Sequence, residues 1–311
     1  MQTIYLAHPY DQEQLYDQPV VLALGFFDGV HLGHQEVIKK GRELADHYQV
    51  PLAVLTFNHT PRLVYQQIHP NHYFYLSDNP RKIELMEVNG VDILYIAEFT
   101  SAMGAQSPQE FVDSYMVNLN AVHVVAGFDY TYGLKEIANM QTLVDHSQGR
   151  FKISEIPKKT IGDHKISSSE IQYQLSNGNI DLANQELGYI YETRGLVING
   201  LKRGRKLGFP TANVAMDYGQ LTPGIGVYIV EICVQGQWYM GMASIGHNIT
   251  FDDVKELSIE VYILDFDRMI YGEKVRIKWH HYLRGEIKFD GIEGLINQLE
   301  KDQDHTRAYF K

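Results

Sequence analysis

A chain of 311 residues is long enough to form two domains, each with an apolar core of its own. Hydrophobic residues make up 44% of it and charged residues 21%, which is typical of a folded protein and excludes extensive disorder. The formal net charge of −11 argues against binding to nucleic acid, because polyanions are held by many Lys and Arg side chains. No apolar run approaches the length needed to cross a bilayer, and the first residues lack the pattern of a secretion signal. We therefore expect a cytoplasmic protein without a membrane partner.

Strands and helices alternate in the first half of the chain. Near-continuous apolar runs, typical of parallel strands covered on both faces, lie at residues 20–27, 52–57, 92–99 and 122–128. Helical patterns lie between and after them, at residues 35–48, 80–89 and 108–119. This alternation predicts an α/β domain over residues 1–185: a doubly wound, Rossmann-like sheet with its ligand site at the carboxyl ends of the strands.

The first predicted strand ends in the sequence G-F-F-D-G-V-H-L-G-H, residues 25–34, directly before a helix. Glycines allow the backbone to approach a ligand closely, and a helix N-terminus offers free N–H groups to anions. His31 and His34 can donate hydrogen bonds to phosphate oxygens and stabilise charge during phosphoryl or nucleotidyl transfer. The turn is therefore a candidate ATP site, and the alternative is a glycine-rich turn with two surface histidines.

The second half of the chain has strands at shorter spacing, at residues 191–199, 226–234, 238–244, 258–266 and 274–283. Glycine-bearing turns separate several of them, which predicts an antiparallel β-barrel over residues 186–311. Val275, Ile277 and Trp279 alternate with polar residues and should form a buried face. A helix near residues 292–302 should pack against the barrel. The single cysteine, Cys233, lies within a predicted strand and is expected to be an inert, reduced thiol.

A basic loop with the sequence G-L-K-R-G-R-K-L-G-F-P-T-A-N occupies residues 200–213. Its basic side chains can neutralise phosphates, and its glycines let backbone N–H groups approach them. Thr211 and Asn213 present side-chain oxygens, the ligands that Mg²⁺ prefers. A basic surface loop would explain the lysines and arginines but not the F-P-T-A-N that follows. The residues predicted to bind ATP phosphates here are Lys202, Gly204, Arg205, Gly208, Pro210 and Thr211.

The turn at residues 25–34 closely resembles the H-x-G-H signature of nucleotidylyltransferases, in the longer form typical of bacterial FAD synthetases. The resemblance continues through residues 55–57, the segment ending in Lys82, residues 127–133 and residues 166–169. It implies that the first domain transfers AMP from ATP to FMN and releases pyrophosphate. The resemblance implies catalytic roles for His31 and His34, ATP binding by Gly25, Phe27, Asp28, Gly29, Gly33, Ser168 and Ser169, and flavin binding by Asp129 and Tyr132. Ser168 and Ser169 precede an amphipathic helical pattern, and the alternative is that they only cap this helix.

The loop at residues 200–213 resembles the riboflavin kinase signature G-x-x-x-G-R-x-x-G-F-P-T-A-N. Matching runs follow at residues 223–228, 260–266 and 284–289. The resemblance implies that Thr211 and Asn213 bind ATP and its Mg²⁺, that Glu260 accepts the proton of the riboflavin hydroxyl, and that Arg284 and Phe289 bind the flavin.

The two signatures together predict a bifunctional enzyme of the riboflavin kinase/FMN adenylyltransferase family. It would phosphorylate riboflavin to FMN and adenylylate FMN to FAD, with riboflavin, FMN and ATP as small-molecule substrates and Mg²⁺ as cofactor. The sequence does not predict an oligomeric state.

The chain departs from the FAD synthetase pattern near the expected ligand loops. Gln172 stands where the family has an arginine that assists the triphosphate, and Ala138 and Asn139 replace a glycine and an aspartate. A neutral amide cannot make the charge-assisted pair that guanidinium makes with phosphate. The alternative is thus a monofunctional riboflavin kinase with a degenerate adenylyltransferase domain. A flavin-sensing regulator without turnover is a third hypothesis, which would leave Glu260 without a role.

Overall fold

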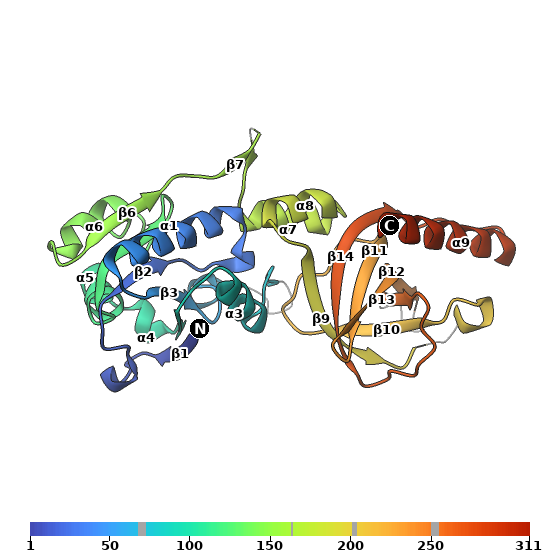
Figure 1. Cartoon of the computed structure of the whole chain (residues 1–311), viewed down its shortest axis with the longest axis horizontal. Coiled ribbons are helices and arrows are strands. Elements are labelled where there is room, and N and C mark those ends of the chain that lie inside the picture. The colour runs from blue at the N-terminus through green and yellow to red at the C-terminus, as the bar shows by residue number, and fades with distance from the viewer. Residues whose placement is uncertain (68–72, 163, 201–203, 250–254) are drawn as a thin grey trace. The chain divides into compact units, whose positions relative to one another are not determined.

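The computed structural model describes residues 1–67, 73–162, 164–200, 204–249 and 255–311 (Figure 1). The chain forms two compact units, Met1–Ser168 and Ser169–Lys311. Helices α7 (Ser168–Ser176) and α8 (Ile180–Leu187) group with the second unit, apart from the first residue of α7. The sequence-based boundary between residues 185 and 186 stays a prediction of where the two activities divide. Among the described residues, no helix is both long and apolar enough to cross a membrane.

The first unit contains a sheet of six parallel strands in the order β1-β4-β3-β2-β5-β6. The strands are β1 (Gln2–Ala7), β2 (Val20–Leu24), β3 (Leu52–Phe57), β4 (Ile93–Glu98), β5 (Ala121–Gly127) and β6 (Lys152–Ile156). The predicted parallel sheet is confirmed. Its two edge strands, β1 and β6, were not predicted, because they are partly exposed and lack a continuous apolar run.

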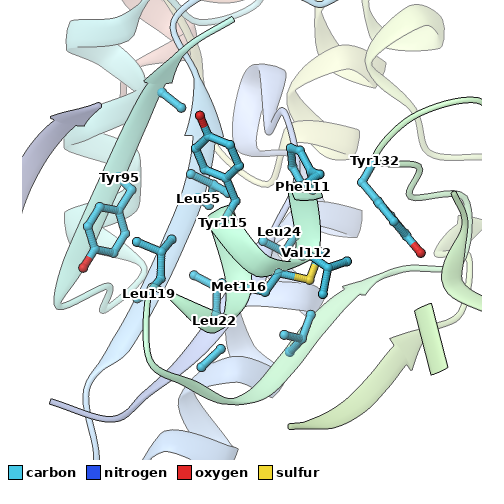
Figure 2. Close-up of a cluster of buried hydrophobic side chains, with 14 of the residues drawn as sticks. Leu22, Leu24, Leu55, Tyr95, Phe111, Val112, Tyr115, Met116, Leu119 and Tyr132 are labelled. Carbon is cyan, nitrogen blue, oxygen red and sulfur yellow. The ribbon is translucent and has the colours of Figure 1, made fainter. Parts of the chain in front are cut away.

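Helices cover both faces of this sheet, because alternate strand residues point to opposite sides. On one face α1 (Leu32–Tyr48) packs so closely that a Cβ on Gly41 would lie 2.7 Å from Leu52 Cδ1. On the other face α5 (Pro108–Val112) and the π-helical segment η4 (Asp113–Val117) lie over Leu22 and Leu24, as Figure 2 shows. The doubly wound arrangement is therefore confirmed.

The remaining elements of the first unit are short. They are α2 (Arg62–Tyr65), α3 (Asn79–Val88), α4 (Ser101–Gly104), α6 (Met140–Ser147), the 3₁₀ turns η1 (Gln12–Gln14) and η2 (Asp28–Val30), and the hairpin of β7 (Thr160–Ile161) and β8 (His164–Lys165). The predicted helix at 108–119 is thus divided into α5 and η4.

The second unit contains a closed antiparallel barrel in the order β10-β13-β12-β11-β14-β9. Its strands are β9 (Tyr191–Ile198), β10 (Thr211–Met216), β11 (Gly226–Val234), β12 (Gln237–Ile249), β13 (Lys255–Ile263) and β14 (Lys274–Arg284). The predicted barrel is confirmed, with Val275, Ile277 and Trp279 buried inside it. Cys233 is buried on β11.

Two details of the barrel go beyond the sequence-based prediction. The sequence-based prediction placed the first residues of β10 in the basic loop, because Thr211 and Asn213 are polar. In the structure β10 is a strand, and it closes the barrel by pairing with both β9 and β13. The last helix is longer than predicted: α9 (Ile292–Tyr309) packs through Ile296 and Leu299 onto Phe209 and its apolar neighbours. Helix α9 therefore covers the barrel surface next to the basic loop, while η5 (Gly204–Leu207) is a single turn within that loop.

Candidate active sites

The turn after β2 has an unusual backbone. Phe27 (φ 54°), Gly29 (φ 76°) and Val30 (φ 38°) all have left-handed conformations, which β-branched and bulky residues rarely adopt. Such strain persists only where the surroundings hold it, and it is concentrated at functional sites. The predicted strand at 20–27 therefore ends at Leu24, and the remaining residues form a sharp turn into α1.

Asp28 holds this turn in place. Its buried carboxylate accepts hydrogen bonds from the N–H groups of Leu76 (2.9 Å) and Ser77 (3.1 Å), and Gly29 N–H donates to Ser77 Oγ (2.9 Å). Ser168 Oγ donates to the Asp28 carbonyl (3.0 Å). Asp28 and Ser168, both predicted to bind ATP, thus make hydrogen bonds that hold the turn in its conformation.

His31 and His34 lie at the first turn of α1 with their rings stacked, 3.6 Å between centroids. His31 Nδ1 caps the helix by accepting from His34 N–H at 3.3 Å. Burial lowers the pKa of His31 to about 4 and the pKa of His34 well below its usual range. Both rings are therefore neutral near pH 7, and His31 carries its proton on Nε2, from which it can donate to a phosphate.

The two flanking glycines leave room for aromatic rings. A Cβ on Gly25 would lie 3.0 Å from the Phe27 ring, and a Cβ on Gly33 would lie 3.1 Å from the His31 ring. Phe27 in turn contacts His34 edge-on, 5.2 Å between centroids. The predicted turn residues thus form one packed unit around the two histidines.

A cavity of about 710 Å³ lies beyond the carboxyl ends of β3 and β4. Aromatic and aliphatic side chains predominate in its lining, and such cavities commonly bind organic ligands. Its lining includes Phe57, Tyr65, Phe99, Phe111, Tyr132 and Leu134. Of the two predicted flavin residues, Tyr132 is in this wall, whereas Asp129 is exposed and pairs with Lys165 at 2.8 Å.

The departures from the family pattern in the first unit have a structural basis. Asn139 caps α6 through its side-chain oxygen, which accepts from the N–H groups of Gln141 and Thr142. Ala138 is fully buried, and its Cβ would meet a Cβ on Gly133 at 3.0 Å. Ser169 and Gln172 both lie on α7.

The second site is on the outer surface of the barrel. Thr211 Oγ1 donates to Glu260 Oε2 at 2.9 Å, and Asn213 is paired directly with Glu260 in the β10–β13 register. Ile259 and Val261, the neighbours of Glu260, are buried, so Glu260 itself points away from the barrel interior. Three predicted residues thus come together from segments about 50 residues apart in sequence.

A pocket of about 590 Å³ opens beside this group. Its lining includes Thr211, Ser244, Glu260, Arg284, Phe289 and Leu299. Of the predicted flavin residues, Phe289 and Arg284 both line it, but the Arg284 guanidinium is bonded to the buried carboxylate of Asp302 on α9 (2.7 and 3.0 Å). Arg284 therefore anchors α9 beside the pocket, a role that the sequence did not indicate.

The basic loop is only partly described. Lys202 lies outside the described residues, and the side chain of Arg205 is likewise outside them. A Cβ on Gly204 would collide with the Phe209 carbonyl, and Gly208 has φ 85°, so both glycines are required by the backbone. A smaller pocket of about 380 Å³ adjoins Pro210 and Thr211 and extends to Phe266 and Tyr271.

Two residues that shape these sites belong to the segments that carry the family resemblance, but the sequence indicated no role for either. Lys82 is buried beneath the first site, and Gly200 packs against Asn213 in the second.

The fold and the two sites define a two-domain transferase, with a histidine-bearing turn on a parallel sheet and a hydroxyl–carboxylate pair on a closed barrel. A family model for FAD synthetase matches residues 13–170, and one for riboflavin kinase matches residues 187–310. The chain belongs to the bifunctional riboflavin kinase/FMN adenylyltransferase family, and it contains both domains.

Relatives named bifunctional riboflavin kinase/FMN adenylyltransferase match along the whole chain. The one from Listeria monocytogenes is 50% identical over 310 residues, and the one from Bacillus subtilis 39% identical over 320 residues; each match covers 100% of this chain and 98% of the relative. A crystal structure from Streptococcus pneumoniae, named a macrolide-efflux protein, has a TM-score of 0.91 at 34% identity and covers 99% of both chains. The predicted family is thus confirmed.

Proposed function

We propose that the barrel phosphorylates riboflavin with ATP to FMN, and that the parallel-sheet unit then adenylylates FMN with a second ATP to FAD and pyrophosphate. The observation that carries the kinase half is the hydrogen bond between Thr211 and Glu260 at the edge of a pocket that contains Phe289. The adenylyltransferase half rests on the stacked, neutral histidines at the start of α1 and on a separate aromatic cavity in the same unit. We assign the first activity to residues 186–311 and the second to residues 1–185, the division that the sequence predicts.

Glu260 is the proposed base of the kinase. A carboxylate beside the primary hydroxyl of riboflavin accepts its proton as the hydroxyl oxygen bonds to the γ-phosphorus of ATP and ADP leaves. Thr211 orients this carboxylate through its 2.9 Å hydrogen bond. The flavin ring would lie in the 590 Å³ pocket against Phe289. The nucleotide would extend from Thr211 toward the smaller pocket at Pro210 and Tyr271.

The oxygen donors at this site fit a magnesium ion carried by ATP. Thr211 supplies a hydroxyl and Asn213 an amide oxygen, both on β10, while Glu260, the proposed base, lies beside them on the paired strand β13. Mg²⁺ takes few protein ligands when nucleotide phosphates supply the others, which agrees with the lack of a cluster of three acidic or histidine ligands among the described residues. When bound, the ion would neutralise phosphate charge.

The histidines of the first unit are the proposed donors for adenylyl transfer. An FMN phosphate oxygen forms a bond to the α-phosphorus of ATP, the bond to the β-phosphate oxygen breaks, and pyrophosphate leaves with the electron pair. Charge develops on the phosphate oxygens during this step, and preorganised neutral donors stabilise it. His31 and His34, together with free N–H groups at the start of α1, supply such donors. Tyr132 and its neighbours would hold the flavin ring.

Product analysis tests both halves. Purified protein with Mg²⁺-ATP should convert riboflavin to FMN and FMN to FAD, separated by chromatography with the flavin oxidised in one series and reduced in the other. Accumulation of FMN without FAD in both series would contradict the adenylyltransferase half. A biosynthetic enzyme that consumes ATP would act in the cytoplasm, and fractionation of cells that express the chain tests this location.

A further inference from the structure

Lys82 is a buried cation beneath the turn of the first site. It belongs to α3, and only 1% of its surface is exposed. Its Nζ donates to the carbonyls of Phe26 (2.9 Å) and Phe57 (3.3 Å) and to Thr56 Oγ1 (3.4 Å), and it lies 4.3 Å from the centre of the Phe26 ring. These contacts join the segments that follow β2 and end β3, the two strands that lead to the turn and the aromatic cavity.

This cation has no carboxylate partner in an ion pair within the described residues. The titratable groups that act on it are Asp28 of η2 and His34 of α1. Burial lowers the pKa of Lys82 to about 8, and Asp28 opposes this shift. Taking an ammonium out of water without an anionic partner is costly, and a neutral amide donor could bond the same carbonyls without burying a charge. A purely structural role therefore leaves the charge of Lys82 unexplained.

A bound polyphosphate would explain it. The Phe26 carbonyl that Lys82 binds directly precedes the turn at 27–30, and the start of α1 is the proposed phosphate site. The charge also acts on the catalytic group itself: burial is the main cause of the low pKa of His34, the neighbouring His31 ring comes next, and the positive charge of Lys82 lowers this pKa further. A fixed charge in a low-dielectric interior acts more strongly on a nearby anion than the same charge in water.

We infer that Lys82 is a positioning residue for adenylyl transfer, which holds the ends of β2 and β3 together and supplies a fixed positive charge behind the ATP phosphates. This inference rests on the proposed adenylyltransferase function. Lys82 gives up no proton in the reaction: it adds to the effect of burial on the pKa of His34 and stabilises the charge that passes to pyrophosphate.

The test compares Lys82→Met with Thr56→Val in the full-length chain. The methionine removes the charge at nearly constant volume. Thr56→Val leaves the charge, but it removes the hydrogen bond from Thr56 Oγ1 to the same Phe26 carbonyl (2.8 Å) and the longer one from Lys82 Nζ to Thr56 Oγ1 (3.4 Å). FAD formation from FMN and Mg²⁺-ATP is measured from pH 6.5 to 10, and FMN formation from riboflavin by the same preparation shows that the barrel is intact.

We expect kcat/KM for ATP in the wild type to fall above about pH 8, as Lys82 loses its proton. Lys82→Met should lower this constant about 10- to 100-fold at pH 7 and abolish the alkaline decline. Thr56→Val should retain the decline. Lys82→Arg carries a charge that does not titrate in this range, so the activity that it retains should show no alkaline decline.

Three results would overturn the inference: an unchanged alkaline decline in Lys82→Met, equal losses in Lys82→Met and Thr56→Val, or an alkaline decline in Lys82→Arg like that of the wild type. Each of them leaves FAD synthesis by the wild type intact. A wild type that makes no FAD at any pH would instead contradict the proposed function, and the inference with it. The two failures are therefore distinguishable.

Discussion

Gly200 gives a sharp test of the proposed kinase site, because only a hydrogen atom fits where its side chain would be. A Cβ on Gly200 would lie 2.7 Å from Asn213 Oδ1 and closer still to the rest of that amide. Gly200 does not have a positive φ, so an alanine meets no backbone strain there. Gly200→Ala should therefore act through one event, the displacement of the Asn213 side chain.

The size of the effect follows from that displacement. An off-rotamer side chain costs about 0.5–1.5 kcal/mol, so the protein should stay folded. A hydrogen bond or ligand contact to a charged group contributes about 1.5–3 kcal/mol, and its loss corresponds to a decrease of roughly 10- to 150-fold in kcat/KM. We expect a decrease of this size in riboflavin phosphorylation, with FAD formation from added FMN unchanged because it takes place in the other unit.

The assay is chromatographic separation of FMN and FAD after incubation with Mg²⁺-ATP. Gly236→Ala is the opposite control: no atom lies within 4 Å of the added Cβ, but at φ 82° the alanine is strained, so this variant tests strain without a collision. In an Asn213→Ala background, Gly200→Ala should cause almost no further loss. An undiminished further loss would refute the reasoning, because the alanine would then act on something other than Asn213.

Three further predictions follow from the sites. Glu260→Gln keeps the shape of the side chain but removes the proton acceptor, so riboflavin phosphorylation should fall at least about 100-fold while FMN adenylylation persists; unchanged phosphorylation would exclude Glu260 as the base. Burial lowers the pKa of His31 from 6.5 to about 4, so between these pH values the unfolded state binds more protons than the folded state. The free energy of unfolding should therefore fall by about 3 kcal/mol as the pH drops from 6.5 to 4. His31→Asn keeps an oxygen that can cap α1 but has no titrating ring, so urea titrations should show a smaller loss of stability over this pH range. A loss equal to that of the wild type would show that His31 is not its cause. Asp302→Ala leaves the Arg284 guanidinium without its partner and should lower the free energy of unfolding by about 3 kcal/mol. Kinase activity should then be lost at a lower urea concentration. An unchanged midpoint would show that the ion pair does not anchor α9.

The local pattern of the sequence was sufficient for the architecture and for the two chemical motifs. Continuous apolar runs indicated the central strands β2, β3, β4 and β5, because strands covered on both faces need apolar residues at every position. The turn at 25–34 and the loop at 200–213 are contiguous in sequence, and their spacing alone indicated phosphate chemistry. The edge strands β1 and β6 were not predicted, because a strand with exposed residues has no continuous apolar run.

Only the tertiary structure decided which side chains face a ligand and which hold the fold. Asp28 and Arg284 stand at positions that the family resemblance assigns to ligands, yet the first bonds to backbone N–H groups and the second to Asp302. Lys82 ends a segment of the family resemblance, but the sequence indicated no role for it, since its environment is formed by two strand ends and a helix. Such contacts join residues that are 18 to 56 positions apart. A sequence pattern records spacing along the chain, whereas burial and hydrogen bonding depend on which of these distant segments the fold brings together.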